Sequence, residues 1–442
     1  MRLLFVHQNF PGQYRHILRL LAAEGRHEIV FLTRNANETL PGIRKLVYQC
    51  HREPHPNTHH YLKTTESAVL HGQAVARACL DLKQQGFTPD LMIGHNGWGE
   101  ILFLKDVYPD TPLLGYFEFF YRARGVDVGF DPEYPSTPDS APRVRMMNAG
   151  NLLGLDAADW GQTPTLWQRD QYPARYHDRL LVCHEGIDTS VVRPNAEVQL
   201  TLPSGRVLTR ADQVITFVSR NLEPYRGFHI FMRALPELLA RHPQAHVVLL
   251  GGDEVSYGAR LPPGESYKAR LLAEVGSKLD PARVHFLGKV PYGTFLQVLQ
   301  VSSAHVYLTY PFVLSWSLME AMAAECMIIG SATPPVMEVI AHERNGLLVD
   351  FFDRQALLAA VDRALAQGED LAAMRRAARQ HVLNHFDLHG ICLPNHRAII
   401  EHLAAGKPPP ALRRRAAEIA RPVSPTGLVN IDTARVGAIE EA

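Results

Sequence analysis

Short apolar runs alternate with amphipathic segments along most of the chain. The first run, residues 3–6, is apolar at every position, and a loop and an amphipathic segment at residues 15–23 follow it. A second apolar run spans residues 27–33. Continuous apolar runs of this length are typical of strands that are buried on both faces of a parallel sheet. The pattern therefore predicts a β-α-β unit at the start of the chain and an α/β fold class.

The same pattern predicts six strands in each half of the chain. In the first half they span residues 2–7, 27–33, 90–94, 112–117, 160–163 and 180–183, and in the second half 213–218, 245–250, 284–287, 304–308, 327–330 and 345–349. Residues 194–212 contain proline and glycine and show little periodicity, so we expect a linker there. We predict two Rossmann-like parallel-sheet domains that face a cleft, residues 1–193 and 213–385.

Length and composition favour a globular enzyme. A chain of 442 residues exceeds one ordinary core, and 46% of its residues are hydrophobic while 20% are charged. The formal net charge of zero argues against a nucleic-acid-binding protein. The five cysteines show no CxxC spacing, no apolar run reaches transmembrane length, and the N-terminal run is too short for a signal peptide. We therefore expect free thiols and a cytoplasmic protein.

Candidate binding residues follow the predicted strands of the first half. Gly12 lies in the loop after the first strand, His95 follows the strand at 90–94, and Glu118 follows the strand at 112–117. Ligands of open α/β sheets bind at the carboxyl ends of strands, so these residues are candidates for ligand contact. For Glu118 two roles stay open, because Arg122 and Arg124 follow it. It could contact an acceptor hydroxyl group or tune a proton, or it could form an ion pair that holds the loop.

The second half contains a candidate anion site. Residues 310–330 predict a strand end, a short loop, a helix that begins near Ser315, and a further strand. A helix start offers unpaired backbone N–H groups to a phosphate, and Glu320 on the second turn could accept a bond from a sugar hydroxyl. Arg220 and Arg226 flank a neighbouring loop, and guanidinium groups suit diphosphate oxygens. An ordinary buried crossover helix is the alternative interpretation.

Other segments carry weaker signals. Residues 45–62 are rich in histidine, but their spacing matches no common metal-ligand pattern, so we expect a solvated loop. The chain contains no Asp-X-Asp triplet, Gly-X-Ser-X-Gly elbow or Walker-type phosphate loop, and no metal is indicated. Residues 125–143 are rich in turns, which is typical of a lid or an acceptor loop. Residues 406–442 predict a flexible tail, in which the basic run 413–415 is solvated or touches anionic lipid.

Taken together, these motifs resemble the retaining nucleotide-sugar glycosyltransferases of family 4, which have the two-domain GT-B fold. The chain is most similar to a bacterial subgroup that opens with His-Gln-Asn-Phe-Pro-Gly-Gln-Tyr, here residues 7–14. In the second half the resemblance depends on Arg220, on Arg226, on residues 312–324 and on residues 335–349. It covers about residues 1–405, and each motif is weak by itself.

The resemblance implies a role for each matching residue. Arg220 matches the family's diphosphate arginine, and Arg226 stands where a lysine is usual. Glu320 matches the second glutamate of the Glu-x7-Glu motif, whereas Phe312 occupies the position of the first. His95 resembles the histidine near the transferred sugar, and the helix at about 386–405 resembles one that returns to the first domain. The donor-binding residues that the resemblance implies are Gly12, Val290, Val313, Leu314, Ser315 and Glu320.

We therefore predict a retaining, metal-independent hexosyltransferase that uses no cofactor and takes a nucleoside-diphosphate sugar as its co-substrate. Its catalytic residues would be His95, Arg220, Arg226 and Glu118. The family implies a glycan or a lipid-linked glycan as acceptor, synthesis of surface polysaccharide or glycoconjugate, and a peripheral contact with the inner face of the membrane. Two alternatives stay open, a nucleotide-sugar epimerase and a binding regulator that has lost catalysis. The nucleotide, the sugar, the acceptor and the oligomeric state do not follow from the sequence.

Overall fold

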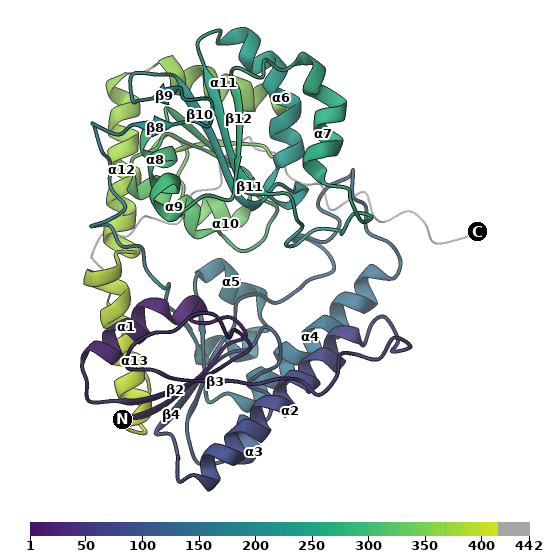
Figure 1. Ribbon diagram of the computed structural model, residues 1–442, viewed down its shortest axis with the longest axis vertical. Coiled ribbons are helices and arrows are strands. Elements are labelled where there is room, and N and C mark those ends of the chain that lie inside the picture. The colour runs from purple at the N-terminus through teal and green to yellow at the C-terminus, as the bar shows by residue number, and fades with distance from the viewer. Residues whose placement is uncertain (367, 414–442) are drawn as a thin grey trace.

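The computed structural model describes residues 1–366 and 368–413 of the chain, and it contains two parallel-sheet domains (Figure 1). The first domain has a seven-stranded sheet in the order β3-β2-β1-β4-β5-β6-β7, and the second has a six-stranded sheet in the order β12-β11-β10-β13-β14-β15. All paired strands within these two sheets run parallel. The predicted fold class is confirmed.

The strands lie close to the predicted positions. Those of the first sheet are β1 Arg2–Val6, β2 Glu28–Thr33, β3 Arg44–Val47, β4 Leu91–His95, β5 Leu113–Tyr116, β6 Trp160–Thr163 and β7 Leu180–Val182. Those of the second sheet are β10 Val214–Asn221, β11 His246–Gly252, β12 Val284–Gly288, β13 Ala304–Tyr307, β14 Ile328–Ser331 and β15 Leu347–Val349.

Helices cover both faces of each sheet. In the first domain these are α1 Arg15–Ala23, α2 Lys63–Gln84, α3 Leu104–Val107, α4 Ser140–Ala157 and α5 Leu166–Gln171. In the second they are α6 Phe228–Arg241, α7 Tyr267–Val275, α8 Tyr292–Val301, α9 Trp316–Ala323, α10 Pro334–Met337, α11 Arg354–Ala366 and α12 Glu369–His385.

Alternate residues of each central strand enter two different cores. In β11, Val247 and Leu249 pack with α6 and α7, whereas Val248 and Leu250 pack with α8 and α9. All four side chains are buried. Each fully buried aliphatic side chain stabilises the fold by about 1.5–3 kcal/mol, so the continuous apolar runs of the sequence reflect burial on both faces.

One strand of the two large sheets was not predicted. Arg44–Val47 forms β3, which pairs with β2 at the edge of the first sheet, although residues 45–62 were expected to form a solvated loop. Two of its four residues are exposed and none is buried, so the apolar signal of an interior strand is absent. Basic side chains are common on edge strands because they oppose pairing with another chain.

The predicted linker carries a small hairpin. Strands β8 Leu200–Thr201 and β9 Val207–Leu208 pair antiparallel within residues 194–212. Val198, Leu200, Leu202 and Leu208 are buried in one of the cores of the second domain. This part of the chain is therefore packed onto the second domain and does not span the gap between domains as a free linker.

The chain returns to the first domain after α12. A short helical turn, Leu388–Cys392, leads into α13 Leu393–Ala404, which packs against α1 and β4. The Asn395 amide then holds the backbone of Arg413, with its Oδ1 accepting from the Arg413 N–H at 2.7 Å. Residues 414–442, with most of the predicted tail and of its basic run, lie outside the described residues.

Residues 125–139, here called the strap, leave the first domain and dock onto the second. The Phe130 ring lies 5.1 Å from the ring of Tyr310. The buried carboxylate of Asp131 accepts a hydrogen bond from the Tyr310 hydroxyl at 2.6 Å and lies 2.9 Å from Nε2 of His229. Glu133 adds an ion pair with Arg233 of α6 at 2.6 Å. The two domains are thus joined along both edges, by the strap and by the connection from α12 to α13.

The cysteines of the described residues are all free thiols, and four of the five are buried. None of the described helices combines the length and the apolar character needed to span a membrane.

Candidate active site

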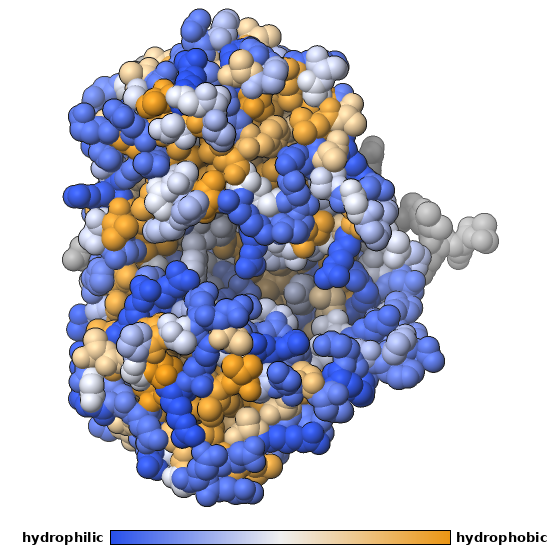
Figure 2. All heavy atoms as spheres, in the orientation of Figure 1, coloured by the Kyte–Doolittle hydropathy of each residue, from blue (hydrophilic) through white to orange (hydrophobic). Residues whose placement is uncertain are grey.

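A pocket of about 250 Å³ lies between the two domains. Figure 2 shows the surface hollowed at this level, with hydrophilic side chains along the rim. Six of the predicted site residues line the pocket, and they come from both domains: Glu118, Arg220, Arg226, Val313, Leu314 and Ser315. Arg220 lies at the end of β10 and the others follow β5, β10 or β13, so the carboxyl ends of both sheets point into one cleft, as parallel α/β sheets require.

Arg226 provides a buried positive charge on the second-domain wall. Its Nη1 donates to Thr309 Oγ1 at 2.8 Å, to the Val313 carbonyl at 3.0 Å and to the Tyr307 hydroxyl at 3.2 Å. All three partners are neutral, and no carboxylate forms an ion pair with Arg226 among the described residues. Glu223 and Glu118 act on this charge electrostatically but form no ion pair with it, so the guanidinium can still pair with an anionic ligand.

The turn that carries Arg226 requires a glycine after it. Gly227 has φ of 69°, and a Cβ there would lie 2.3 Å from the Leu308 side chain. Only glycine fits this close approach at a left-handed backbone angle. The short turn Pro224–Arg226 thereby packs on the end of β13 and directs the guanidinium into the cleft.

Arg220 differs from Arg226 in its surroundings. It stands near the end of β10, is exposed, and makes no hydrogen bond or ion pair within the described part of the chain. Its side chain lines the same pocket. A long exposed cation of this kind can turn toward a ligand phosphate without breaking a native contact.

The first turn of α9 adds backbone donors to the same wall. Ser315 is the N-cap, and its hydroxyl accepts from the Ser317 N–H at 3.3 Å. The Ser315 N–H donates to the Tyr307 hydroxyl at 2.9 Å, which anchors the loop before the helix to β13. Val313 and Leu314 precede the cap and line the pocket. The positive end of the helix dipole therefore lies beside the two arginines.

Glu320 lies one turn further along α9 and outside this pocket. It is half-buried, and its Oε1 accepts a hydrogen bond from the Tyr292 hydroxyl at 2.7 Å. Burial raises the pKa of Glu320, and the hydrogen bond from Tyr292 opposes the shift. Val290 also lies outside the pocket and packs, half-buried, against the second-domain core.

His95, the last residue of β4, lies buried behind the first-domain wall and does not itself line the pocket. Its ring stacks on Trp98 and Tyr116, with centroids 4.8 and 5.1 Å apart, and its Nδ1 accepts from the Gly97 N–H at 2.9 Å. Burial, together with the neighbouring His7, lowers the pKa of His95 well below its usual range. The imidazole is therefore neutral and carries its proton on Nε2, which has no hydrogen-bond partner in the described residues.

Glu118 faces this unsatisfied nitrogen. Its Oε2 lies 3.8 Å from His95 Nε2, and 42% of its side chain is exposed to the cleft. Burial raises the pKa of Glu118 to about 7, and the negative charge of Glu185 adds to this effect. The positive charges of Arg220 and Arg226 lower the pKa. No arginine pairs with Glu118 among the described ion pairs, so the loop-holding role that the sequence left open finds no support.

Gly12 supports the site from behind. A Cβ at Gly12 would lie 2.7 Å from Nε2 of His7, and its φ of 56° is left-handed. The neighbouring Gln13 lines the pocket, and its Oε1 lies 2.6 Å from His7 Nε2. The glycine allows the loop to close over His7, while Gln13 supplies the group that reaches the cleft.

Phe312 lies beside the pocket without lining it. Its buried ring packs on Phe119 of the first domain, at a centroid distance of 4.7 Å, and on Tyr257 at 4.9 Å. The guanidinium of Arg226 lies over the Tyr257 ring, 5.3 Å from its centroid. The position that the resemblance assigns to a sugar-binding glutamate therefore holds an apolar contact between the two domains.

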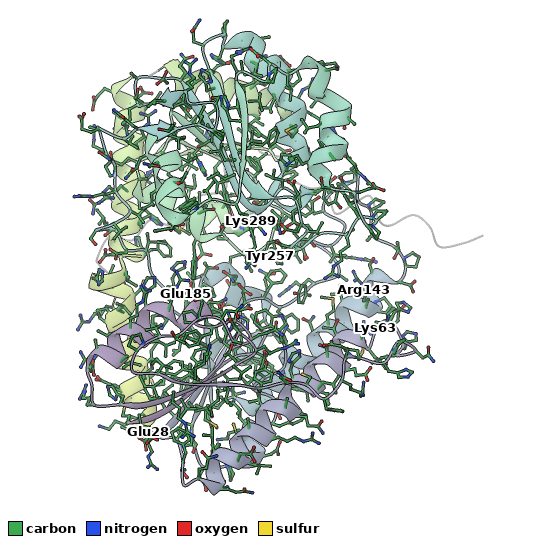
Figure 3. The ribbon with its side chains drawn as sticks, in the orientation of Figure 1. Glu28, Lys63, Arg143, Glu185, Tyr257 and Lys289 are labelled. Carbon is green, nitrogen blue, oxygen red and sulfur yellow. The ribbon has the colours of Figure 1, made fainter. Side chains whose placement is uncertain are left out.

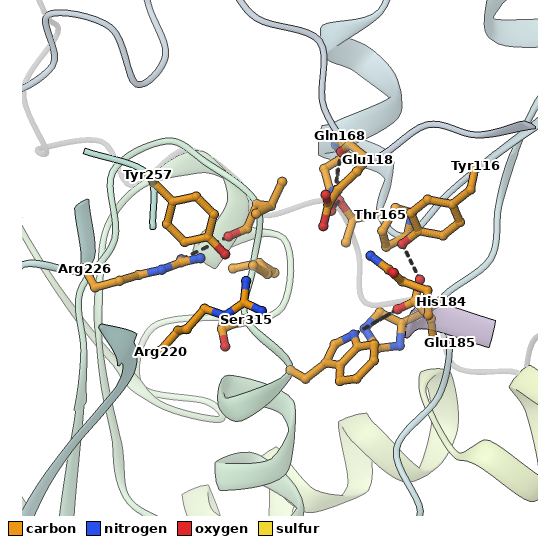
Figure 4. A pocket seen from close by; sticks show the side chains of 15 residues that line it. Tyr116, Glu118, Thr165, Gln168, His184, Glu185, Arg220, Arg226, Tyr257 and Ser315 are labelled. Atoms are coloured by element: carbon orange, nitrogen blue, oxygen red, sulfur yellow. Dashed lines mark hydrogen bonds and ion pairs between the residues drawn. The ribbon is translucent and has the colours of Figure 1, made fainter. Parts of the chain in front are cut away.

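Sequence reasoning missed several pocket residues. Glu185 follows β7, and Trp316 begins α9. The others are Gln13, Tyr116, Pro164, Thr165, Gln168, His184 and Tyr257. Figure 4 shows Tyr257 on one side of the pocket and Tyr116, Gln168, His184 and Glu185 on the other. Glu185, like His95, is a polar residue close to the carboxyl end of a predicted strand. This position could have identified it as a candidate site residue. The histidine-rich segment contributes nothing here, and within the described residues no group of three or more potential ligands could hold a metal ion.

Two family models match the chain, one in each half. Residues 25–192 match the model described as "Glycosyl transferase family 4 group", and residues 205–381 match "Glycosyl transferases group 1". Neither match alone reaches half of the chain. The two matches follow one another in the same order as the two domains of the structure.

Curated relatives match part of the chain. A D-inositol 3-phosphate glycosyltransferase of Rhodococcus jostii (strain RHA1) is 28% identical over 217 residues, which is 46% of this chain and 46% of that protein. The chain thus matches about half the length of such relatives.

Solved structures match nearly the whole chain. Sucrose-phosphate synthase from Thermosynechococcus elongatus aligns with a TM-score of 0.69 and 18% identity, over 92% of this chain and 100% of that one. Anabaena Alr3699/HepE in complex with UDP and glucose aligns with a TM-score of 0.62 and 16% identity, over 92% and 100%. The fold is the two-domain GT-B fold.

Proposed function

We propose that this protein is a retaining, metal-independent glycosyltransferase that moves a hexose from a nucleoside-diphosphate sugar to an acceptor hydroxyl group. The observation that carries the proposal is the buried guanidinium of Arg226, which forms no ion pair among the described residues and lies beside the start of α9, opposite a first-domain wall that has the unpaired Nε2 of His95 behind it. The glycosyltransferase family models that match both halves of the chain support it.

In the proposed complex the diphosphate lies on the second-domain wall. Arg220, Arg226 and the backbone N–H groups after Ser315 would stabilise the charge that develops on the leaving diphosphate. Glu320, with Val290 further along the wall, would hold the nucleoside. Val313 and Leu314 would line the junction of phosphate and sugar.

The first-domain wall would handle the sugar and the acceptor. The Nε2–H of His95 would donate to a sugar hydroxyl, and Gly12 would let its loop close over the donor. We propose front-face attack, in which the acceptor oxygen bonds to the anomeric carbon from the side that the diphosphate leaves. The departing diphosphate would take the acceptor proton, and Glu118 would orient the acceptor hydroxyl.

The relatives indicate which donors to test first. The HepE structure is described in complex with UDP and glucose, so UDP-hexoses head the series of candidate donors. For the acceptor we propose a glycan or lipid-linked glycan in surface polysaccharide synthesis, handled in the cytoplasm at the inner face of the membrane. This assignment depends on family resemblance alone.

A binding regulator is the second candidate, and Phe312 is the observation that favours it. An apolar ring there removes a polar contact to the donor sugar that the family resemblance implies. Such a regulator would bind the nucleotide-sugar and show no turnover with any acceptor. An epimerase would convert the nucleotide-sugar with no acceptor present.

Donor binding and one variant test the proposal. A thermal-shift series with UDP-, GDP-, ADP- and dTDP-sugars should give one clear stabiliser, since a ligand at 100 times its dissociation constant adds about 2.7 kcal/mol of stability. Arg220→Ala should then lower kcat/KM by about 100- to 1,000-fold. Folding should be unaffected, because the side chain has no native partner among the described residues. No shift with any donor, or near-normal activity of the variant, would refute the assignment.

A further inference from the structure

The carboxylate of Glu185 joins the two walls of the pocket. Glu185 follows β7 of the first domain and is only 3% exposed. Its Oε1 accepts a hydrogen bond from the Tyr116 hydroxyl of β5, and its Oε2 accepts one from the Trp316 indole Nε1 at 2.9 Å. Trp316 belongs to the other domain. In Figure 3, Glu185 lies at the cleft surface of the first domain, facing the second.

Trp316 is the first residue of α9 and directly follows the Ser315 cap, so its position affects the helix start. Its side chain is 40% exposed, so packing alone holds it weakly. Its indole N–H is its one side-chain donor, and Glu185 accepts it. The hydrogen bond therefore fixes the first turn of α9 relative to the first domain.

We propose that Glu185 is a positioning residue of the transfer. It holds the start of α9 against the first-domain wall through Trp316, and it places a negative charge opposite the Glu118 carboxyl group. This inference rests on the proposed function, because the start of α9 is where the donor diphosphate would bind.

The negative charge of Glu185 affects the pKa of Glu118. After burial, Glu185 is the main influence that raises the pKa of Glu118 to about 7, and Arg220 and Arg226 oppose it. His95, at 3.8 Å, is neutral because its pKa lies well below the usual range. Three tyrosines also interact with Glu118, and raised pKa values keep them neutral in any ordinary assay: Tyr116, Tyr121 and Tyr172.

Removing the charge of Glu185 while keeping its shape should thus make Glu118 ionise at lower pH. In Glu185→Gln the amide can still accept from the Trp316 indole and donate to the Tyr116 oxygen. We expect the acid limb of the pH profile of kcat/KM to move down by about one pH unit, on the scale of charge-pair effects. A purely structural role for Glu185 would leave this limb in place.

A variant that loses the Trp316–Glu185 hydrogen bond but keeps the Glu185 charge tests whether Glu185 positions the start of α9. Trp316→Phe keeps an aromatic ring but deletes the N–H, and we expect the dissociation constant of the donor nucleoside diphosphate to rise about 3- to 10-fold. Trp160→Phe, in the first domain and outside the pocket, is the matched control. It should leave the dissociation constant within twofold.

The outcomes separate this inference from the proposed function. If the unmodified protein binds no nucleoside diphosphate, the proposed function fails. If it binds and turns over a donor, but Trp316→Phe keeps its affinity and Glu185→Gln keeps its acid limb, the positioning role of Glu185 alone is overturned. Trp316→Phe sits at a partly exposed site, so it gives an answer even if Glu185→Gln folds poorly.

Discussion

The two walls of the cleft carry opposite kinds of chemistry. The second-domain wall presents cations without carboxylate partners, Arg220 and Arg226, beside a helix start. The first-domain wall presents the carboxylates of Glu118 and Glu185 and the neutral imidazole of His184, whose pKa is lowered by burial, and His95 lies buried behind them. Figure 4 shows the two groups facing each other.

The difference assigns separate tasks to the two walls. An anionic diphosphate would be attracted to the cationic wall and repelled from the carboxylates across the cleft. Hydroxyl groups of a sugar or an acceptor suit the first-domain wall, which offers carboxylate oxygens as acceptors and has the unpaired Nε2–H of His95 buried behind it. Charge complementarity alone would therefore orient a nucleotide-sugar in the pocket.

The largest expected effect comes from neutralising the cationic wall. Arg226→Met should lower kcat/KM by about 1,000-fold, since it removes the buried charge that would face the leaving group. It also leaves the Val313 carbonyl without its donor, at a cost of about 1–3 kcal/mol of stability. Steady-state kinetics and thermal melting measure the two effects.

Arg270→Met is the matched control for this variant, because among the described residues the Arg270 side chain pairs only with the exposed Glu265 on the same domain. It should keep normal activity. A folded Arg226→Met protein that works within tenfold of the unmodified protein would show that the cationic wall is not where leaving-group charge is stabilised.

An intermediate effect should follow from a change on the opposite wall. His95→Phe keeps a ring between Trp98 and Tyr116 but removes the unpaired Nε2–H. We expect kcat to fall about 10- to 100-fold, on the scale of a lost hydrogen bond in a buried site. The dissociation constant of the nucleoside diphosphate should stay within twofold. Calorimetry that showed a large loss of nucleotide affinity would contradict the division of tasks between the walls.

The smallest effect concerns stability and pH. The pKa of Glu118 is raised to about 7 from an ordinary value of 4.5, so the folded state holds a proton that the unfolded state releases between these values. Stability is therefore lost as pH rises through 7, and Glu118→Gln should be relatively more stable at pH 8 than at pH 4. Because the side chain is 42% exposed, we expect only about 0.5 kcal/mol.

Melting curves of Glu118→Gln and the unmodified protein at both pH values measure this difference. If the stability difference between the two proteins is the same at pH 4 and at pH 8, the surroundings of Glu118 do not disfavour its charged form. The carboxylate wall would then be less distinct from the cationic wall than we infer.

The sequence predicted the cationic wall better than the carboxylate wall. Arg220, Arg226 and Ser315 lie in local patterns, a strand end or a helix start, and the structure brings them to one pocket. All three residues are positioned by elements of their own domain. Local periodicity is sufficient to locate such residues, because the carboxyl ends of parallel strands always meet at one edge of a sheet.

Glu185 and Trp316 could not be paired in this way. They lie 131 positions apart in different domains, and their hydrogen bond depends on how the domains face each other. The same limit applies to Phe312, whose contact with Phe119 spans the cleft. Edge strand β3 was missed for a local reason, since none of its four residues is buried.

The strap has a consequence for any attempt to recombine this protein with its relatives. Phe130 and Asp131 belong to the first half of the chain but cover Tyr310 and His229 of the second. A chimera joined near residue 193 would give its second half a foreign strap, and the buried His229 and Tyr310 would then depend on that strap for a carboxylate. Exchange of donor specificity by domain shuffling therefore has to transplant residues 125–139 together with the second domain, as a third segment of the crossover.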